Sequence, residues 1–244
     1  MRSRKLGRNV RAILLAGGKG TRLAPYTTVL PKPLMPLGDM PIAEVIVRQF
    51  RRIGIRDVTF CVGYLSSLIQ AYFGNGERFG LKIWYSEETR PLGTAGPIGL
   101  VRELKDTFVV LNGDILTTLD FKAMVEFHRE EKAIATVGVF SKKIKIDLGI
   151  LELDSKGRIQ KYIEKPTLTY PVSMGIYVFE PDVLEYVPKK RHLDLPDLIR
   201  SLIKKGLPVQ TFFCKGIWLD IGRKEDYDNA LQVFERNRKQ FHVD

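Results

Sequence analysis

The chain has 244 residues, of which 44% are hydrophobic and 27% charged, and its formal net charge at pH 7 is +11. These proportions are ordinary for a globular protein, and the length suits one α/β domain with a single large core. No apolar run is long enough to cross a membrane, and residues 1–9, MRSRKLGRN, lack the apolar segment of a secretion signal. We therefore expect a cytoplasmic protein without a membrane partner, in which residues 1–9 form a basic extension.

The excess of positive charge fits two kinds of partner, nucleic acid or small anions held in a positive cleft. Basic residues are spread along the chain, and no zinc-finger spacing or RNA-binding aromatic pattern accompanies them. We therefore expect no nucleic-acid partner. The two cysteines, Cys61 and Cys214, stand alone in apolar runs and are expected to be buried free thiols.

The first predicted element is a buried strand at residues 12–16, which breaks into GGKGTR at residues 17–22. Three glycines in four positions let backbone N–H groups approach a ligand closely, because no Cβ intervenes. Lys19 and Arg22 add positive charge beside those donors, and Lys32 follows between two prolines. This glycine-rich loop lacks the Lys-Ser/Thr pair of a P-loop and the third glycine of the dinucleotide fingerprint. It is predicted to bind a polyphosphate.

Apolar residues then recur at helical spacing over residues 42–53, where Gly54 ends the predicted helix. A buried strand at residues 58–62, a short helix at about residues 68–73 and a strand at residues 82–85 follow. This alternation predicts a parallel sheet with helices on both faces. Ligands of such sheets bind at the carboxyl ends of the strands, which is where the glycine-rich loop is expected to lie.

Residues 87–99, EETRPLGTAGPIG, come next and are expected to form a loop. Regular structure is expected again from about Gly96, in a helix that carries Leu100 and Leu104. Composition alone indicates only a surface loop.

A wholly apolar strand at residues 108–111 stops at Asn112-Gly113-Asp114. A carboxylate at this strand end would share a crevice with the glycine-rich loop. A hard cation such as Mg²⁺ takes oxygen ligands and often bridges carboxylate and phosphate. The alternative is an ordinary turn, since Asn, Gly and Asp all favour turns.

The second half of the chain also alternates helices and strands. The expected elements are a helix at residues 121–131 capped by Asp120, strands at 135–140, 173–179 and 209–213, a hairpin at 147–164, and helices at 195–205 and 224–240. The hairpin turns at residues 154–157 and ends in Glu164-Lys165-Pro166. A lysine so fixed could hold a phosphate as a point charge, although strand-end Glu-Lys pairs are usually solvent-exposed.

The segment LLAGGKGTRLAPYTTVLPKPLMPLGDMPI resembles the signature of the sugar-1-phosphate nucleotidylyltransferases, L-x-G-G-x-G-T-R-L followed by P-K-P-L-x-P. The resemblance extends to about Asn229. Within the family, the sequence looks most similar to the mannose-1-phosphate guanylyltransferase-like branch. It implies an α/β fold, with a Rossmann-like, mainly parallel sheet flanked by helices and an inserted β-hairpin in a sugar-binding subregion. A single nucleotidyltransferase domain is implied at residues 10–244. Its nucleotide-binding part is at about 10–120, its sugar-phosphate-binding part at about 121–230 and its C-terminal helix at about 224–240.

The resemblance implies nucleotide-binding residues in the first part of the chain. They are Leu15, Ala16, Gly17, Gly18, Lys19, Gly20, Thr21, Arg22, Lys32, Glu87, Gly93 and Thr94. The segment after residue 86 looks most like the guanylyltransferase version, E-x-x-P-L-G-T-A-G. Glu87 is then the expected contact to the base edge, with Glu88 as an alternative. A carboxylate accepts from both donors on the edge of guanine, so GTP is the favoured substrate.

Sugar-phosphate and metal ligands are implied in the same way. The sugar-phosphate-binding residues are Asn112, Gly149, Glu164, Lys165, Ser173 and Gly175, and the ligands of Mg²⁺ are Asp114 and Asp220. Lys165 of E-K-P would hold the sugar phosphate, and Glu164 would meet sugar hydroxyls. Ser173 stands where the family's N-x-G-I-Y segment frequently has Asn. Asp220 lies in WLDIG, close to the family's W-x-D-x-G.

The implied reaction is Mg²⁺-assisted in-line attack of a sugar 1-phosphate on the α-phosphate of an NTP, with release of pyrophosphate. Arg22, Lys32 and Asp114 would be the catalytic residues, because positioned cations stabilise the charge that builds on the phosphates. The alternatives are a UTP- or dTTP-using enzyme, a glycosyltransferase, and a non-catalytic regulatory homologue that binds NDP-sugar. A glycosyltransferase would typically carry D-x-D where Asn112-Gly113-Asp114 stands. Homo-oligomer formation is left open.

Overall fold

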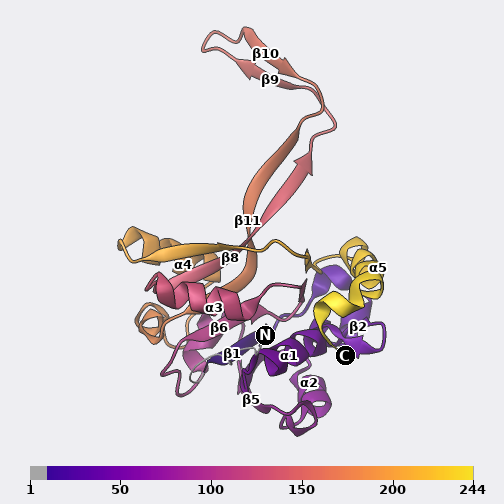
Figure 1. Cartoon of the computed structure of the whole chain (residues 1–244), viewed down its shortest axis with the longest axis vertical. Helices are drawn as coiled ribbons and strands as arrows, with labels where there is room; N and C mark the ends of the chain where they lie inside the picture. Colours follow the sequence, from indigo (N-terminus) through magenta and orange to yellow (C-terminus); the bar gives the residue numbers. More distant parts are fainter. Residues whose placement is uncertain (1–9, 244) are drawn as a thin grey trace, which may run out of the picture.

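A seven-stranded β-sheet forms the centre of the computed structural model, which describes residues 10–243 (Figure 1). The expected basic extension, residues 1–9, lies outside the described residues. The strand order is β12-β8-β11-β6-β1-β4-β5; β11 runs antiparallel to both neighbours, and the other neighbouring pairs are parallel. The strands are β1 (Arg11–Ala16), β4 (Asp57–Val62), β5 (Lys82–Glu87), β6 (Phe108–Asn112), β8 (Ala135–Lys145), β11 (Thr167–Phe179) and β12 (Val209–Phe213). The predicted mainly parallel sheet is confirmed.

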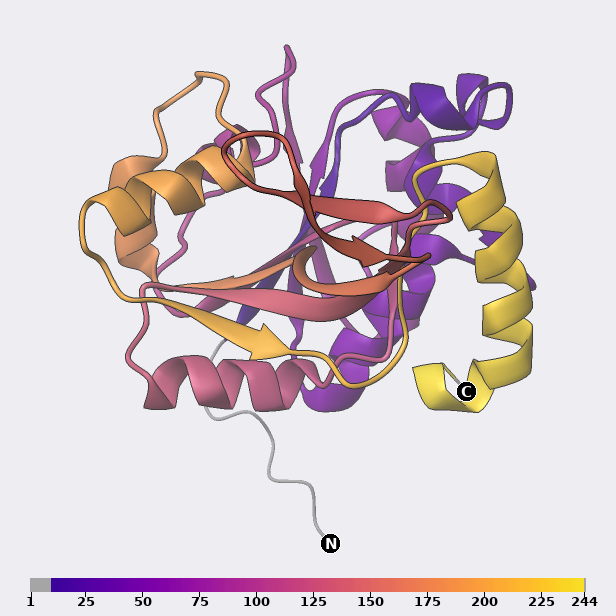
Figure 2. The same cartoon turned by 90° about the horizontal axis from the view of Figure 1, so that it is seen from above.

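Helices cover both faces of this sheet (Figure 2). The α-helices are α1 (Ile42–Ile53), α2 (Ser66–Phe73), α3 (Phe121–Glu130), α4 (Leu195–Lys204) and α5 (Lys224–Phe241). Residues of α1, α2 and α3 share one buried cluster with Ala12 and Leu14 of β1, whereas residues of α4 share another with Ile13. Successive strand residues point to opposite faces, so the unbroken apolar run of β1 serves two cores.

Two predicted helix boundaries are confirmed in detail. Gly54 ends α1 with φ of 96°, a left-handed conformation that suits glycine, and its N–H donates to the Arg51 carbonyl at 3.3 Å. The Asp120 side chain accepts from the Ala123 N–H at 3.0 Å, which satisfies a donor in the first turn of α3.

Smaller elements complete the body. Three two-stranded sheets pair β2 (Pro36–Leu37) with β3 (Met40–Pro41), β7 (Ile115–Thr117) with β13 (Trp218–Asp220), and β9 (Ile150–Leu153) with β10 (Ile159–Ile163). The 3₁₀ helices are Thr21–Leu23, Tyr26–Thr28, Lys32–Leu34, Glu77–Phe79, Gly96–Leu100 and Pro181–Tyr186. Within residues 10–243, no helix is both long and apolar enough to span a membrane.

The strands β8 and β11 continue past the sheet as a two-stranded ribbon, which carries the β9–β10 hairpin at its far end (Figure 1). We call residues 141–171 the arm. The predicted hairpin and its turn are confirmed, since Asp154 Oδ1 accepts from the N–H groups of Lys156 and Arg158. Large apolar side chains on the arm are exposed, including Leu148 at 74%. The arm therefore stands away from both cores.

One predicted element is wrong. The helix expected to carry Leu100 and Leu104 is only the 3₁₀ helix Gly96–Leu100, and Leu104 lies in irregular structure. Two glycines in this short stretch lower its helix propensity by about 1 kcal/mol each. Val101 is extended and Glu103 has φ of 58°, so the backbone turns away from a helical path.

Candidate functional site

A cavity of about 840 Å³ opens where several parallel strands end. Its walls come from the end of β1, the glycine-rich loop, and the segments that follow β4, β5 and β6. Thirteen predicted residues line it: Leu15, Ala16, Gly17, Gly18, Lys19, Gly20, Thr21, Arg22, Lys32, Gly93, Thr94, Asn112 and Asp114. The loop therefore lies at the carboxyl edge of the sheet, where the alternation of elements predicts it.

Two glycines of the glycine-rich loop, and Gly113 in the turn after β6, lie where a side chain would meet close neighbours. A Cβ on Gly17 would stand 2.3 Å from Glu88 Oε1, and one on Gly113 would stand 2.9 Å from the Leu15 carbonyl oxygen. Gly20 has φ of 62°, and its carbonyl accepts from the Thr27 hydroxyl at 2.8 Å. These glycines keep the floor of the cavity open to a ligand.

Lys32 and Asp114 form an ion pair at the base of the cavity. Lys32 is 8% exposed, and its ammonium group donates to Asp114 Oδ2. The other carboxylate oxygen, Asp114 Oδ1, is buried and has no hydrogen-bond partner among residues 10–243. A buried, unpaired carboxylate oxygen is costly, so this atom is suited to a ligand that brings positive charge.

A second carboxylate, Asp220, lies beside the first. In the β7–β13 ladder Asp220 is opposite Ile115, and the Ile221 N–H donates to the Asp114 carbonyl at 3.2 Å. Burial raises the pKa of Asp220, and the negative charge of Asp114 raises it further, while Lys32 and Arg22 act in the opposite direction. The structure thus brings both predicted metal ligands together from segments about a hundred residues apart in the chain.

These residues fit a divalent cation in part. The orphaned oxygen of Asp114 and its repulsion with Asp220 both favour bound positive charge. No group of three or more His, Cys, Asp or Glu side chains in the described range could hold a metal ion. The remaining oxygen ligands would therefore come from phosphate groups and water, as is usual for Mg²⁺.

The two adjacent glutamates after β5 lie in different environments. Glu87 accepts from the Ser66 hydroxyl at 2.8 Å and does not line the cavity. Glu88 lines it, with Oε2 accepting from the Leu92 N–H at 3.0 Å. Counting back from Pro91 in E-x-x-P also places the motif's glutamate at Glu88, a signal already present in the sequence.

The Gly93-Thr94 segment is fixed against the start of α4. The Thr94 N–H donates to Asp194 Oδ1 at 3.0 Å, and its hydroxyl accepts from the Leu195 N–H at 2.8 Å. Gly93 has φ of 77°, and a Cβ there would stand 2.6 Å from the Leu193 carbonyl oxygen. Both residues line the cavity and also anchor its wall.

The structure adds lining residues that the motifs do not indicate. They include Cys61, Tyr64, Arg90 and His192. Cys61 lies in β4 and is buried, as predicted; burial raises the pKa of its thiol to about 12, with a smaller contribution from Glu88. The thiol stays protonated near neutral pH, so it is a poor nucleophile and part of the wall. Cys214 is buried as well.

The predicted sugar-phosphate residues divide into two groups. A Cβ on Gly175 would stand 2.7 Å from Asn112 Nδ2, so Gly175 lies against a residue of the cavity, and the Gly175 N–H donates to the Ser173 hydroxyl. Gly149, Glu164 and Lys165 lie on the arm and do not line the cavity. Lys165 Nζ is 3.9 Å from Glu164, and both side chains are more than half exposed.

Comparisons with known proteins agree with this geometry. A family model described as nucleotidyl transferase matches residues 11–237. The chain is 36% identical to a UTP–glucose-1-phosphate uridylyltransferase of Synechocystis, covering 96% of this chain and 66% of the relative. It is 31% identical to the mannose-1-phosphate guanylyltransferase catalytic subunit beta of Xenopus tropicalis, covering 96% and 67%. The chain thus spans about two thirds of the length of these relatives.

Solved structures give the same result. A Bacillus anthracis crystal structure, described as a glucose-1-phosphate thymidylyltransferase in complex with a sucrose, superposes with a TM-score of 0.77 at 26% identity. That alignment covers 96% of this chain and 99% of the other. The structure of HddC from Yersinia pseudotuberculosis has a TM-score of 0.70 at 23% identity and supports the fold alone.

Proposed function

The chain belongs to the nucleotidyl transferase family, and on that premise we propose that it joins an NTP and a sugar 1-phosphate to give an NDP-sugar and pyrophosphate. One observation carries the proposal: a single cavity contains the glycine-rich loop, Arg22, Lys32 and Asp114. Backbone donors and cations around one open cavity suit a triphosphate. The attacking oxygen is proposed to come from the sugar 1-phosphate. The Cys61 thiol in the cavity wall is a poor nucleophile, because burial raises its pKa to about 12.

The phosphates are held by the loop and two cations. Backbone N–H groups of residues 17–21 bind the phosphate oxygens, and Arg22 and Lys32 stabilise the α-phosphate and the leaving pyrophosphate. Lys32 is buried, so little water screens its charge. Arg22 is exposed beside Gly222, where it is free to close on a ligand.

Asp114 and Asp220 would hold Mg²⁺, which when bound neutralises phosphate charge and orients both substrates. Asp114 Oδ1 is the oxygen without another partner, and Asp220 is its neighbour across β7 and β13. Lys32 keeps the other oxygen of Asp114 in place.

The sugar 1-phosphate is proposed to bind on the side of β11. Asn112 lines the cavity, Gly175 lies against Asn112, and Ser173 is bonded to Gly175. Lys165, Glu164 and Gly149 would join them when the arm bends toward the cavity. Lys165 then holds the phosphate that attacks, and Glu164 meets the sugar hydroxyls. The exposed arm is able to make such a movement because none of its residues, 141–171, belongs to a buried cluster of the body.

The base is proposed to be guanine, recognised by Glu88. An ionised carboxylate accepts from the N1–H and N2–H donors of guanine, whereas uracil and thymine present one donor between two acceptors. Glu88 replaces Glu87 in this role, because Glu87 is engaged with Ser66 outside the cavity. A preference for UTP or dTTP is the alternative, in line with the names of the uridylyl- and thymidylyltransferase relatives.

A substrate screen tests the proposal. A panel of sugar 1-phosphates is incubated with each of the four NTPs and Mg²⁺, and pyrophosphate release is measured. We expect release only with both substrates present. A protein that releases none with any pair, but transfers sugar from an NDP-sugar to an acceptor, would instead be a glycosyltransferase; one that binds NDP-sugar without turnover would be a regulatory homologue.

A further inference from the structure

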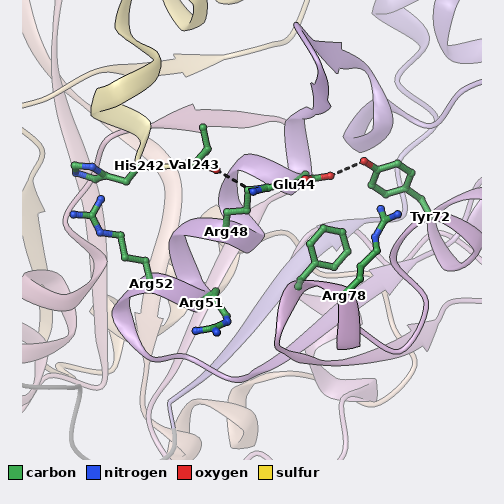
Figure 3. A pocket seen from close by; sticks show the side chains of 9 residues that line it. Glu44, Arg48, Arg51, Arg52, Tyr72, Arg78, His242 and Val243 are labelled. Carbon is green, nitrogen blue, oxygen red and sulfur yellow. Dashed lines mark hydrogen bonds and ion pairs between the residues drawn. The ribbon is translucent and has the colours of Figure 1, made fainter.

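A second pocket, of about 450 Å³, lies apart from the cavity described above (Figure 3). It is formed by residues along α1 from Glu44 to Arg52, by the segment from Tyr72 to Phe79, and by His242 and Val243 after α5. The helix α1 leads back to the start of β4, so its last turns lie toward the amino ends of the strands. The pocket is therefore on the opposite edge of the sheet from the glycine-rich loop.

Four arginines and one glutamate line this pocket, and the glutamate is fully engaged. Arg48 Nε donates to Glu44 Oε1 at 2.8 Å, and Arg48 also donates to the Val243 carbonyl at 3.0 Å. The other oxygen of Glu44 accepts from the Tyr72 hydroxyl. Figure 3 shows this row of contacts across the top of the pocket. Glu44 is thus paired with Arg48, and the described lining residues include no second carboxylate for the other three arginines.

Arg51, Arg52 and Arg78 have no ion-pair partner among residues 10–243. Two of them are in the last turn of α1, where the helix dipole favours positive charge. The dipole does not account for Arg78, which comes from a separate 3₁₀ helix and lines the same space. With no ion pair to a carboxylate in the described part of the chain, these three guanidinium groups give the pocket a positive potential.

Two of these three guanidinium groups pack against neighbouring residues. Arg78 lies over the rings of Tyr72 and Phe79, 4.4 and 4.5 Å from their centroids. Arg51 passes over Gly80, where a Cβ would stand 2.3 Å from its Nε. Burial lowers the pKa of the His242 imidazole, and the positive charge of Arg52 lowers it further. Ordered guanidinium groups lose less entropy on binding than free ones.

We infer that this pocket is a binding site for a small molecule that carries two or more phosphate groups. Arg side chains present paired donors that match phosphate oxygens, and three charges in one hollow favour several phosphates over one. The volume exceeds that of a bare phosphate, which leaves room for a phosphorylated sugar or nucleotide. The inference does not depend on the proposed catalytic function, because it uses none of the same residues.

Calorimetric titration with inorganic pyrophosphate in the absence of Mg²⁺ tests this. All proteins carry Arg22→Ala, which weakens binding in the catalytic cavity. The test variant adds Arg51→Gln and Arg78→Gln. A matched control adds Arg102→Gln and Arg200→Gln, two exposed arginines distant in sequence from every pocket residue, which change the net charge equally. We expect pyrophosphate to bind the control and to bind the test variant at least about tenfold more weakly.

Further arms identify the ligand class and guard against misfolding. Inorganic phosphate should bind the control more weakly than pyrophosphate does. An Arg51→Lys, Arg78→Lys variant keeps the charge and should bind with intermediate affinity, which shows that the fold tolerates changes here. Equal pyrophosphate affinity of test and control proteins overturns the inference, as does co-sedimentation with phosphatidylserine vesicles that requires these arginines and that pyrophosphate does not displace.

Discussion

At the scale of single residues, Glu88 and Glu87 provide a matched pair for testing base recognition. Glu88 lines the cavity, and Glu87 bonds to Ser66 outside it. A charge-assisted hydrogen bond contributes about 1.5–3 kcal/mol, so Glu88→Gln should lower kcat/KM for GTP by about 10- to 150-fold and improve UTP or dTTP. Glu87→Gln should leave the nucleotide preference unchanged. A wild-type preference for UTP, dTTP or CTP over GTP would show that the base assignment is wrong.

The carboxylate pair supports a second prediction. Asp114→Asn and Asp220→Asn each preserve shape and remove one negative charge, so both should abolish Mg²⁺-dependent pyrophosphate release while the protein stays folded. Asp220→Asn should also stabilise the metal-free protein slightly, because it removes a carboxylate whose pKa is raised by partial desolvation and by the negative charge of Asp114. Circular dichroism checks the fold, and rates are measured over a range of Mg²⁺ concentrations. A variant with near-normal rates would remove that residue from the metal site.

Glu180 supports a prediction about acid stability. Burial alone would raise its pKa, but hydrogen bonds from His128 and Thr107 outweigh burial and hold the pKa below 4.5. A group whose pKa is lower in the folded state stabilises the protein above its unfolded pKa, and that contribution disappears as the pH falls through the folded value.

Urea unfolding of wild type and Glu180→Gln should therefore differ most near neutral pH. The difference in unfolding free energy should shrink as the pH drops below 4.5. Glu185→Gln, a change at an exposed glutamate close in sequence, should show no such trend and serves as the control. A constant difference between wild type and Glu180→Gln at all pH values would contradict the assignment.

At the scale of elements, the arm carries three of the residues proposed to bind the sugar 1-phosphate. The pairing of β8 with β11 continues past Phe140 and Val172 along the arm to Lys145 and Thr167. Gly149, Glu164 and Lys165 all lie beyond that point. Replacing residues 141–171 with a two-residue Asn-Gly turn should leave the sheet intact, because Phe140 and Val172 already pair across antiparallel strands and such a turn joins them without strain. NTP binding should persist.

The KM for the sugar 1-phosphate should rise by about tenfold or more in this shortened protein, because the charged contact from Lys165 is lost. Lys165→Ala in the full-length chain should reproduce most of that rise. Nucleotide binding measured by calorimetry and initial rates measured against each substrate distinguish the two effects. An unchanged KM for the sugar phosphate would show that the arm has another role.

At the scale of the whole molecule, the sequence predicts local elements better than their long-range arrangement. Periodicity and capping residues locate nearly all the strands and helices, since these signals are local. The antiparallel insertion of β11 between β6 and β8 depends on which apolar faces meet after folding, and no local pattern records it. The expected helix at Leu100 and Leu104 fails because two glycines and a proline outweigh apolar spacing.

For the candidate functional site as well, the sequence predicts local motifs better than long-range arrangement. Residues within one motif, such as those of the glycine-rich loop, are predicted with their neighbours because the chain itself holds them together. Glu88 is identified only when the path of the chain after β5 is known or when the motif is counted back from Pro91. The orientation of the arm is not encoded in the E-K-P motif, which lies between β10 and β11 toward the far end of the arm. The distance of Lys165 from the cavity therefore emerges only from the structure.

The C-terminal helix α5 packs against residues from the first part of the chain. Residues of α5 share a buried cluster with Leu23 at the end of the glycine-rich loop, with Met35 after Lys32, and with Leu116 next to the Asp114 turn. Phe234 lies at the centre of this cluster, 1% exposed, with its ring 5.4 Å from that of Phe241. The helix thus packs against residues that flank the glycine-rich loop and Lys32.

Phe234→Ala should therefore weaken both the fold and the loop. Loss of a fully buried aromatic ring costs about 3–5 kcal/mol of unfolding free energy, through lost burial and the cavity that remains. Because the cluster lies under residues 23–37, limited proteolysis should cut this region faster in the variant. Phe213→Ala removes a ring that is 51% exposed and should have a far smaller effect. Urea unfolding gives the free energies, and mass spectrometry locates the cuts. Equal stability of the two variants, or faster cleavage elsewhere only, would show that α5 does not support the loop.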